Sequence, residues 1–278
     1  MNSFELTAVI LVIGASAGFL GSLTGLGGGV VITPALTLLF HVDIRYAIGA
    51  TLVSVIATSS GAASAYLKEG FSNIRIGMFL EIATTLGAIA GAFLATRVPT
   101  SALGVGLGLV LLYSAVASIR PQPEVEESDC TDRLAETLKL NSSYPTQRGW
   151  QDYKVQRVKT GFAAMFGAGA LSGLLGIGSG ALKVLAMDRA MRIPFKVSTS
   201  TSNFMIGVTA AASVGVYLNR GYIDPALAMP VMLGVSAGSL LGARLLPGTK
   251  PRILRMVFGA VVGVLALEMI YNGMTGRI

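Results

Sequence analysis

The chain has 278 residues, of which 53% are hydrophobic and 13% are charged, and its mean hydropathy is +0.68. Soluble domains carry about twice that share of charged residues, so the composition excludes an ordinary soluble protein and indicates a membrane protein. The net charge of +7 is spread over the ends of apolar segments, which is typical of membrane topology and not of nucleic-acid binding. We therefore expect the lipid bilayer as a partner and no nucleic acid.

The residue inventory argues against catalysis. Cys130 is the one cysteine, which excludes an intrachain disulfide and a cysteine-based metal cluster, and His41 is the one histidine. The run from Gly25 to Gly29 lacks the Gly-Lys-Ser/Thr sequence that completes a phosphate-binding loop. We expect no catalytic residues, no metal, no cofactor and no enzymatic activity.

The first half of the chain, residues 1–120, reads as an N-terminal transmembrane repeat. It begins with an apolar run that is longer than one span needs and that glycines interrupt. Three further apolar segments follow, each close to the roughly 20 residues that cross a bilayer as a helix. The interrupted run covers 6–40, and the three single spans cover 47–67, 76–96 and 98–119.

The middle of the chain, residues 121–158, is too polar to enter the bilayer and reads as a solvated cytoplasmic linker. It opens with two prolines, carries a run of acidic residues and ends in basic ones. A short amphipathic helix is expected around 134–140, because Leu134 and Leu138 stand four residues apart.

Residues 159–278 form a C-terminal transmembrane repeat with the same order of segments. Its interrupted run contains one cation, Lys183. The run covers 160–187, and the single spans that follow cover 197–219, 225–243 and 256–276.

The two interrupted runs share a glycine-rich motif. Residues 18–29 read Gly-Phe-Leu-Gly-Ser-Leu-Thr-Gly-Leu-Gly-Gly-Gly, and residues 169–180 read Gly-Ala-Leu-Ser-Gly-Leu-Leu-Gly-Ile-Gly-Ser-Gly, an offset of 169 − 18 = 151 residues. A constant register that carries glycine, charge and aromatic positions indicates duplication. Matching pairs are Gly25/Gly176, Gly27/Gly178, Gly29/Gly180, Arg45/Lys196, Thr51/Ser202 and Tyr66/Tyr217. Two glycine-broken segments in corresponding halves are the best sequence indicator of a transporter's binding site.

Loop charges favour an inverted arrangement of the halves. With the linker in the cytoplasm and the halves inverted, most loop cations fall on the cytoplasmic side, as short loops require. We therefore expect an all-α polytopic membrane protein with two inverted-topology repeats and both termini outside. Each repeat has a Gly-broken or re-entrant first segment plus three membrane-spanning helices. The sequence leaves open whether the broken segment crosses twice or dips in and returns.

The motif at 18–29, Pro34, the Ala-Ile-Gly-Ala-Thr-Leu stretch at 47–52 and the weaker second copy resemble the TauE/SafE family of sulfite and organosulfonate exporters. The resemblance covers both hydrophobic halves and not the linker. It implies transport of a small sulfur-containing anion, such as sulfite, a sulfonate or thiosulfate, across a bacterial-type inner (plasma) membrane. The second copy departs from the first: Ser179 replaces a glycine, and Lys183 follows the motif where the ligand is expected.

The residues around the two breaks are the candidate substrate site. A broken helix exposes N–H groups and a positive dipole end, and both suit an anion. Glycines at four-residue spacing, such as Gly87, Gly91 and Gly238, are instead expected to pack helices closely. Hydroxyls in a membrane helix can bond back to the preceding turn, although several of the polar run 198–203 are expected to face the site. The candidate substrate-binding residues are Gly25, Gly27, Gly28, Gly29, Thr24, Thr51, Gly176, Gly178, Ser179, Gly180, Lys183, Ser200, Ser202 and Asn203.

Three ionisable residues have two interpretations each. An ionisable residue in a span is a functional hypothesis by default, so Lys183 is either an anion ligand or a cation that extends to the cytoplasmic face. Arg45 is expected to anchor a helix end. Glu81 is either a proton-coupling group or an acid near a helix start, and we expect the latter.

The leading hypothesis is a secondary transporter for a small anion, with a passive anion channel as the alternative. A non-transporting membrane scaffold is the third hypothesis, but a scaffold does not need paired broken segments. The expected ligand is a small anion, and a homodimer is left open.

Overall fold

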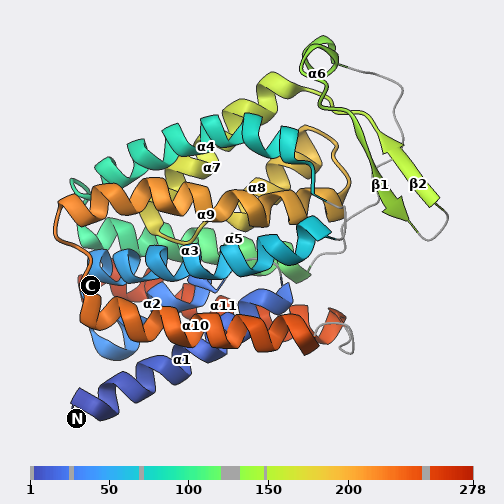
Figure 1. Cartoon of the computed structure of the whole chain (residues 1–278). Helices are drawn as coiled ribbons and strands as arrows, with labels where there is room; N and C mark the ends of the chain where they lie inside the picture. Colours follow the sequence, from blue (N-terminus) through green and yellow to red (C-terminus); the bar gives the residue numbers. More distant parts are fainter. Residues whose placement is uncertain are drawn as a thin grey trace.

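The computed structural model of the chain describes residues 3–24, 28–68, 72–119, 132–146, 149–245 and 251–277. Long helices lie side by side in one bundle, and a small β-hairpin projects from one end (Figure 1). The first half contains α1 (Ser3–Thr24), α2 (Gly29–Phe40), α3 (Ile44–Lys68), α4 (Ile74–Ala95) and α5 (Thr100–Ile119). The linker contains α6 (Arg133–Thr137), β1 (Ser142–Thr146) and β2 (Gly149–Tyr153). The second half contains α7 (Val158–Leu175), α8 (Gly180–Leu185), the π-helix η1 (Ala186–Ala190), α9 (Phe195–Asn219), α10 (Pro225–Leu245) and α11 (Pro251–Met274).

The helices of the bundle have the length and composition of membrane spans. Among the described residues, α4, α5, α7 and α9 are each long and apolar enough to cross a bilayer. The outer face of α4 is apolar, as expected for a surface in contact with lipid, where an exposed hydrophobic side chain has no free-energy cost. Met78, Ile82, Leu86 and Phe93 are exposed on that face. The chain is thus an all-α polytopic membrane protein with a small hairpin in its linker.

The duplication recurs in the helix boundaries. The starts of four helix pairs are each separated by the 151 residues that separate the motifs. The pairs begin at Gly29 and Gly180, Ile44 and Phe195, Ile74 and Pro225, and Thr100 and Pro251. The helix that matches the continuous α2 is divided into α8 and η1, so the second copy is less regular at this position.

Glycines bring the first helix of each half onto the fourth helix of the other half. α1 packs on α10, and α7 packs on α4. A Cβ at Gly18 would lie 2.8 Å from Val235 Cα, and one at the equivalent Gly169 would lie 2.7 Å from Thr84 Cα. Gly87, Gly91 and Gly238 lie in the same crossings, against backbone of the facing helix. The expectation that these glycines pack helices closely is confirmed.

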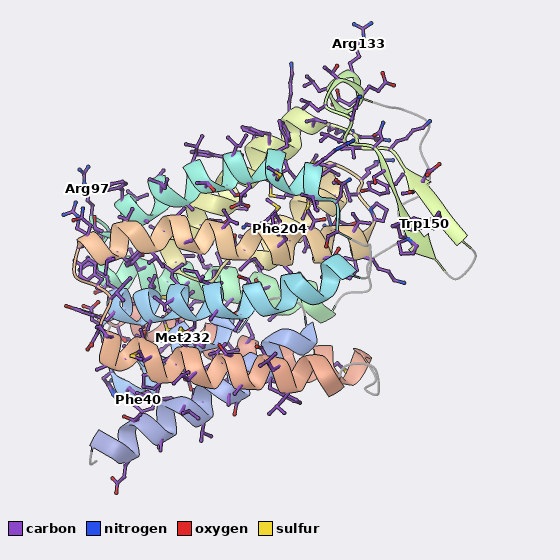
Figure 2. All side chains as sticks on the ribbon, viewed as in Figure 1. Phe40, Arg97, Arg133, Trp150, Phe204 and Met232 are labelled. Carbon is purple, nitrogen blue, oxygen red and sulfur yellow. The ribbon has the colours of Figure 1, made fainter. Side chains whose placement is uncertain are left out.

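Equivalent helices of the two halves run antiparallel where they meet. In the α5–α11 pair, Gly108 faces Ala266 whereas Gly273, further along α11, faces Ser101, earlier on α5. α3 and α9 run antiparallel in the same way. The N- and C-terminal ends lie at one end of the bundle, and the linker lies at the other (Figure 1). Arg97 marks the first end, and Arg133 and Trp150 mark the second (Figure 2).

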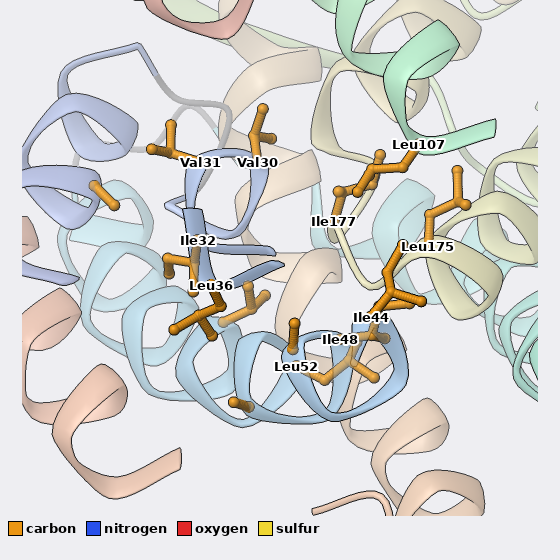
Figure 3. Close-up of a cluster of buried hydrophobic side chains, with 14 of the residues drawn as sticks. Val30, Val31, Ile32, Leu36, Ile44, Ile48, Leu52, Leu107, Leu175 and Ile177 are labelled. Carbon is orange, nitrogen blue, oxygen red and sulfur yellow. The ribbon is translucent and has the colours of Figure 1, made fainter. Parts of the chain in front are cut away.

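An apolar core fills the centre of the bundle. It gathers Val30, Ile32 and Leu36 of α2, Ile44, Ile48 and Leu52 of α3, Leu107 of α5, and Leu175 and Ile177 at the end of α7 and just beyond it (Figure 3). Residues that adjoin the two glycine breaks, such as Val30 and Ile177, therefore belong to one packed cluster. This packing holds the two breaks close to each other.

The linker docks on the bundle through polar contacts at the start of α4. The Asn73 Nδ2 amide donates to the Leu140 carbonyl at 3.1 Å and to the Tyr153 hydroxyl at 2.7 Å. Burial raises the pKa of the Tyr153 hydroxyl above its usual value. The expected helix near 134–140 is present as α6, whereas the β1–β2 hairpin was not expected.

Asp132 joins the linker to the start of α7. Its carboxylate accepts the Val158 N–H at 2.9 Å and the Leu134 N–H at 3.0 Å. These two backbone donors stabilise the charged form and lower the pKa of Asp132 below its usual value.

Candidate functional site

The first break separates α1 from α2. Gly25 and Gly27 lie outside the described residues, and the description resumes at Gly28, which has ordinary helical dihedral angles (φ −67°, ψ −18°). A Cβ at Gly28 would lie 3.2 Å from Gly18 Cα and 3.1 Å from Val235 Cγ1. The chain therefore packs against α1 after the break, and a side chain at position 28 would be restricted by this close packing and not by the φ angle. Thr24 is the last residue of α1.

The second break separates α7 from α8 and is described throughout. Gly176 ends α7 in the left-handed conformation (φ 69°), and its N–H donates to the Ser172 carbonyl at 2.8 Å. Gly178 (φ 69°) and Ser179 (φ 45°) are also left-handed. Left-handed φ angles suit glycine and strain a residue with a Cβ, so Ser179 holds a conformation that costs energy. α8 begins at Gly180 immediately after it.

The two breaks meet beside α3. A Cβ at Gly29 would lie 2.8 Å from Val55 Cγ2 and 3.6 Å from the Gly176 carbonyl oxygen. A Cβ at Gly178 would lie 3.4 Å from Val55 Cγ1 and 3.0 Å from Ile206 Cγ2. Val55 and Ile206 are equivalent residues of the two halves, 151 positions apart. The structure therefore brings predicted site residues from both motifs to one place in the core.

Buried hydroxyls surround this meeting point. The Thr33 hydroxyl donates to the Thr51 hydroxyl at 2.9 Å, and both side chains are buried. The Ser202 hydroxyl donates to the Gly180 carbonyl at 3.3 Å and so ties α9 to the second break. The Ser179 hydroxyl is buried and has no hydrogen-bond partner among the described residues. It is therefore available to a ligand.

The side chains of the polar run at the start of α9 differ in their hydrogen-bond partners. The Ser198 and Ser200 hydroxyls donate to nearby backbone carbonyls, as ordinary membrane hydroxyls do. The Thr201 hydroxyl accepts the Asn73 N–H at 3.1 Å and supports the turn before α4. Thr199 Oγ1 is buried without a partner among the described residues, and the Asn203 side chain is buried.

Lys183 lies one turn beyond Gly180 and is completely buried, with an exposed fraction of 0%. Its ammonium donates to the Thr209 hydroxyl at 2.5 Å, and that hydroxyl donates to Glu81 Oε1 at 2.7 Å. The Lys183 side chain does not reach the surface of the bundle. Instead, two opposite charges from α8 and α4 are linked through a hydroxyl of α9.

Arg45 lies away from this centre, at the end of the bundle that carries the termini. Its guanidinium donates to the Val98 carbonyl at 2.9 Å and lies over the Tyr222 ring, 5.7 Å from the centroid. These contacts join the start of α3 to the loops before α5 and α10, in agreement with the expected role of a helix-end anchor. Among the described residues, no three His, Cys, Asp or Glu side chains are grouped so that they could hold a metal ion.

Sequence reasoning missed the connection between Glu81 and Lys183. Glu81 was expected to be a helix-start acid, but it lies two turns into α4 with an exposed fraction of 8%. The sequence did contain a signal for this connection. Glu81 and Lys183 are single charges of opposite sign, each in an otherwise apolar segment, and such charges are stabilised by pairing. Thr209 carried no such signal, because hydroxyls are common in membrane helices.

The comparison with known families decides the family of the chain. The model of the family described as "Sulfite exporter TauE/SafE" matches residues 10–269. The chain belongs to this family. The match runs through both halves and the linker, so it covers both glycine breaks and the buried Lys183. The resemblance seen in the motifs is confirmed.

Several probable membrane transporter proteins are similar to the chain over nearly their full length. It is 27% identical over 272 residues to the probable membrane transporter protein YunE of Bacillus subtilis, covering 95% of this chain and 97% of YunE. It is 26% identical over 264 residues to the probable membrane transporter protein YdhB of the same species, covering 93% and 98%. A probable membrane transporter protein of Methanocaldococcus jannaschii is 26% identical over 279 residues, covering 95% and 96%. No solved structure matches the chain.

Proposed function

We propose that this chain is a secondary transporter for a small sulfur-containing anion of the sulfite, organosulfonate or thiosulfate class. The observation that carries the proposal is the meeting of the two glycine breaks beside Val55. The Ser179 hydroxyl, which has no partner in the described part of the chain, and the buried Lys183 are close by in sequence. Paired broken segments in corresponding halves are the arrangement that secondary transporters use for binding.

The anion is held from two directions in this proposal. α2 begins at the first break, and its dipole is positive there. The Val31 and Ile32 N–H groups donate to the Gly28 carbonyl, so the first-turn donors left for the anion are the N–H groups of Gly29 and Val30. Ser179 and Thr51 supply hydroxyls, Ser202 holds the second break through its bond to the Gly180 carbonyl, and Lys183 supplies a full positive charge from the second half. Sulfonate-type oxygens accept hydrogen bonds from all of these donors.

The two repeats are inverted in this proposal, with an axis between α3 and α9 and between α5 and α11. The antiparallel course of these equivalent helices supports it. The broken segments are re-entrant, because a 12-residue α2 rises only about 18 Å, which is shorter than a bilayer core of about 30 Å. The protein lies in the plasma membrane with the linker in the cytoplasm, since the linker end carries most of the loop cations.

Transport is tested with purified protein in liposomes. Uptake of radiolabelled thiosulfate and of a labelled sulfonate is measured with and without the unlabelled anion inside. A secondary transporter accelerates uptake when the opposite side is loaded and saturates with concentration, whereas a channel does neither. The matched variants are Gly29→Val, which places side-chain atoms against Val55 and Thr51, and Gly167→Ala, whose Cβ meets nothing within 4 Å. Loss of uptake in the first and normal uptake in the second are expected; equal uptake in both would remove the break from the mechanism.

A further inference from the structure

The chain Lys183–Thr209–Glu81 connects a cation one turn beyond the second break to a buried acid. Three elements contribute one residue each: α8, α9 and α4. The two hydrogen bonds measure 2.5 Å and 2.7 Å, and Thr85 also donates to Glu81 Oε1, at 3.2 Å. Because both charged groups are buried, each depends on the other for its counter-charge.

The second carboxylate oxygen of Glu81 has no such support. Glu81 Oε2 is buried and has no hydrogen-bond partner among the described residues. A buried carboxylate oxygen without a donor is unfavourable, and a proton on that oxygen removes the unfavourable charge. The geometry therefore marks Oε2 as the atom that takes up a proton.

The other ionisable groups on the neighbouring elements lie elsewhere. α7 and α9 pack directly on α4. The described cations of these two helices are Lys159 and Lys196; each is exposed and is the second residue of its helix, at the end of the bundle that carries the linker. Tyr217, near the other end of α9, donates to the Gly173 carbonyl at 3.1 Å. η1, which packs on α7 and α9, carries the buried Asp188 and the exposed Arg189. Among the residues that the structure describes, Lys183 is the charged group that acts on the Glu81 carboxylate.

The Lys183–Thr209–Glu81 chain joins the two halves and is not repeated at the equivalent positions. These positions, 151 residues away, are Ile32, Thr58 and Met232. The Thr58 hydroxyl bonds within its own helix, to the Val55 carbonyl at 3.1 Å. The same helices thus pack without the charged pair, so the fold of a repeat does not require it and its presence calls for a functional reason.

We propose that Glu81 is a proton-binding site that competes with the transported anion for Lys183, so that a proton enters the protein with each anion. A proton from water adds to Glu81 Oε2 and leaves a neutral carboxylic acid. The Lys183 ammonium, which has then lost its counter-charge, takes the anion in its place. When the anion leaves, the acid returns its proton to water and the hydrogen-bonded chain re-forms. This inference rests on the proposed anion transport and names its coupling ion.

The test uses methanesulfonate and thiosulfate, whose own charges do not change in the pH range used, so any pH effect belongs to the protein. Binding is followed by thermal stabilisation of the purified full chain at a series of pH values. Above the pH at which Glu81 loses its proton, the dissociation constant is expected to rise about tenfold per pH unit, because one proton is linked to one anion. In Glu81→Gln, the affinity is expected to stay high and independent of pH. Glu268→Gln, which changes an exposed acid of α11, is expected to behave like the unchanged chain.

A second measurement needs no variant and so does not depend on the folding of Glu81→Gln. Methanesulfonate is added to the unchanged protein in unbuffered solution with a pH-sensitive dye, at a pH where the carboxylate is ionised. Uptake of about one proton per anion bound is the expected result. Binding without proton uptake, or with the same pH dependence in Glu81→Gln, overturns the coupling while anion transport stands. Absence of any anion binding overturns the proposed function as well.

Discussion

Ile32 of α2 and Lys183 of α8 occupy equivalent positions of the two halves, and both are buried, with exposed fractions of 1% and 0%. One position in a duplicated scaffold thus holds a hydrocarbon in one half and an ammonium in the other. The surrounding helices begin at matching residues in both halves. The two halves therefore share the arrangement of their helices but differ in the charges that they bury.

The charged pair has a clear signature in stability. Lys183→Met leaves the Glu81 carboxylate buried without a counter-charge, and breaking a buried pair in this way costs roughly 3–5 kcal/mol. The double variant Lys183→Met/Glu81→Gln carries no buried charge and is expected to lose less than the single variant. Unfolding of the four proteins of this cycle in detergent measures the coupling, with Arg220→Met, at the exposed end of α9, as a control. Additive losses would mean that the two residues do not interact.

The second break requires glycine at position 176. Gly176 has φ 69°, and a Cβ there would lie 2.5 Å from Ile48 Cγ2 and 3.1 Å from Ile48 Cα. Gly176→Ala is expected to lower the free energy of unfolding by about 1–3 kcal/mol through backbone strain and overpacking, and to slow anion uptake. Gly167→Ala, in the helix before the break, is the matched control and is expected to be neutral in both measurements. If Gly176→Ala unfolds and takes up the anion like the unchanged chain, the backbone at the second break can accommodate a side chain.

The helix crossings require glycine equally in both halves. Gly18→Ala and Gly169→Ala each place a methyl group against backbone of the facing helix, and a loss of roughly 1–3 kcal/mol is expected from each. Gly215→Ala, in α9, meets nothing within 4 Å and is expected to leave the melting temperature unchanged. Thermal unfolding of the three variants is the measurement, and a clear difference between the first two would contradict the equivalence of the crossings.

The docking of the linker depends on pH through Asp132. Its folded pKa lies below the unfolded value of about 3.9, so its contribution is complete above that value and is lost as pH falls through the lowered folded pKa. Hydrogen exchange at Leu134 and Val158, corrected for the intrinsic rate, is expected to quicken only in strong acid. Asp132→Ala is expected to exchange quickly at every pH. Equal protection in the variant and the unchanged chain would show that other contacts hold the linker.

The orientation of the chain is tested by cysteine labelling. Cys130 lies outside the described residues, and the linker to which it belongs is expected to face the cytoplasm because of its basic end. In a Cys130→Ser background, Trp150→Cys is expected to react from the cytoplasm and Arg277→Cys from outside, since the two positions lie at opposite ends of the bundle. Labelling of both from one side would contradict the bundle's course through the membrane.

The repeat could be predicted from the sequence, because the helix starts and the glycines at the helix crossings recur at one offset of 151 residues. The partner of each glycine could not be predicted: four-residue spacing says that Gly87 packs a helix closely, but not that the helix is α7. The hairpin was missed because β1 and β2 are short and polar, which makes their pattern weak.

The residues of the candidate site stay a prediction, and the sequence alone indicates only some of their connections. The glycine breaks are visible as local composition, and Lys183 is visible as a charge in an apolar run. Its link to Glu81 joins residues about 100 positions apart in the chain, through a hydroxyl that resembles many others. Only the three-dimensional arrangement of α4, α8 and α9 shows that these two charged residues belong to one hydrogen-bonded group.

The exchange of first helices between the halves has a consequence for how the protein is made. α1 packs on α10, so the surface that receives the first helix does not exist until about residue 245 has been synthesised. During most of translation α1 must wait in the lipid with its glycine face uncovered, and α4 must likewise wait for α7. Neither half encloses its own first helix, so the two halves mature together as a single folding unit.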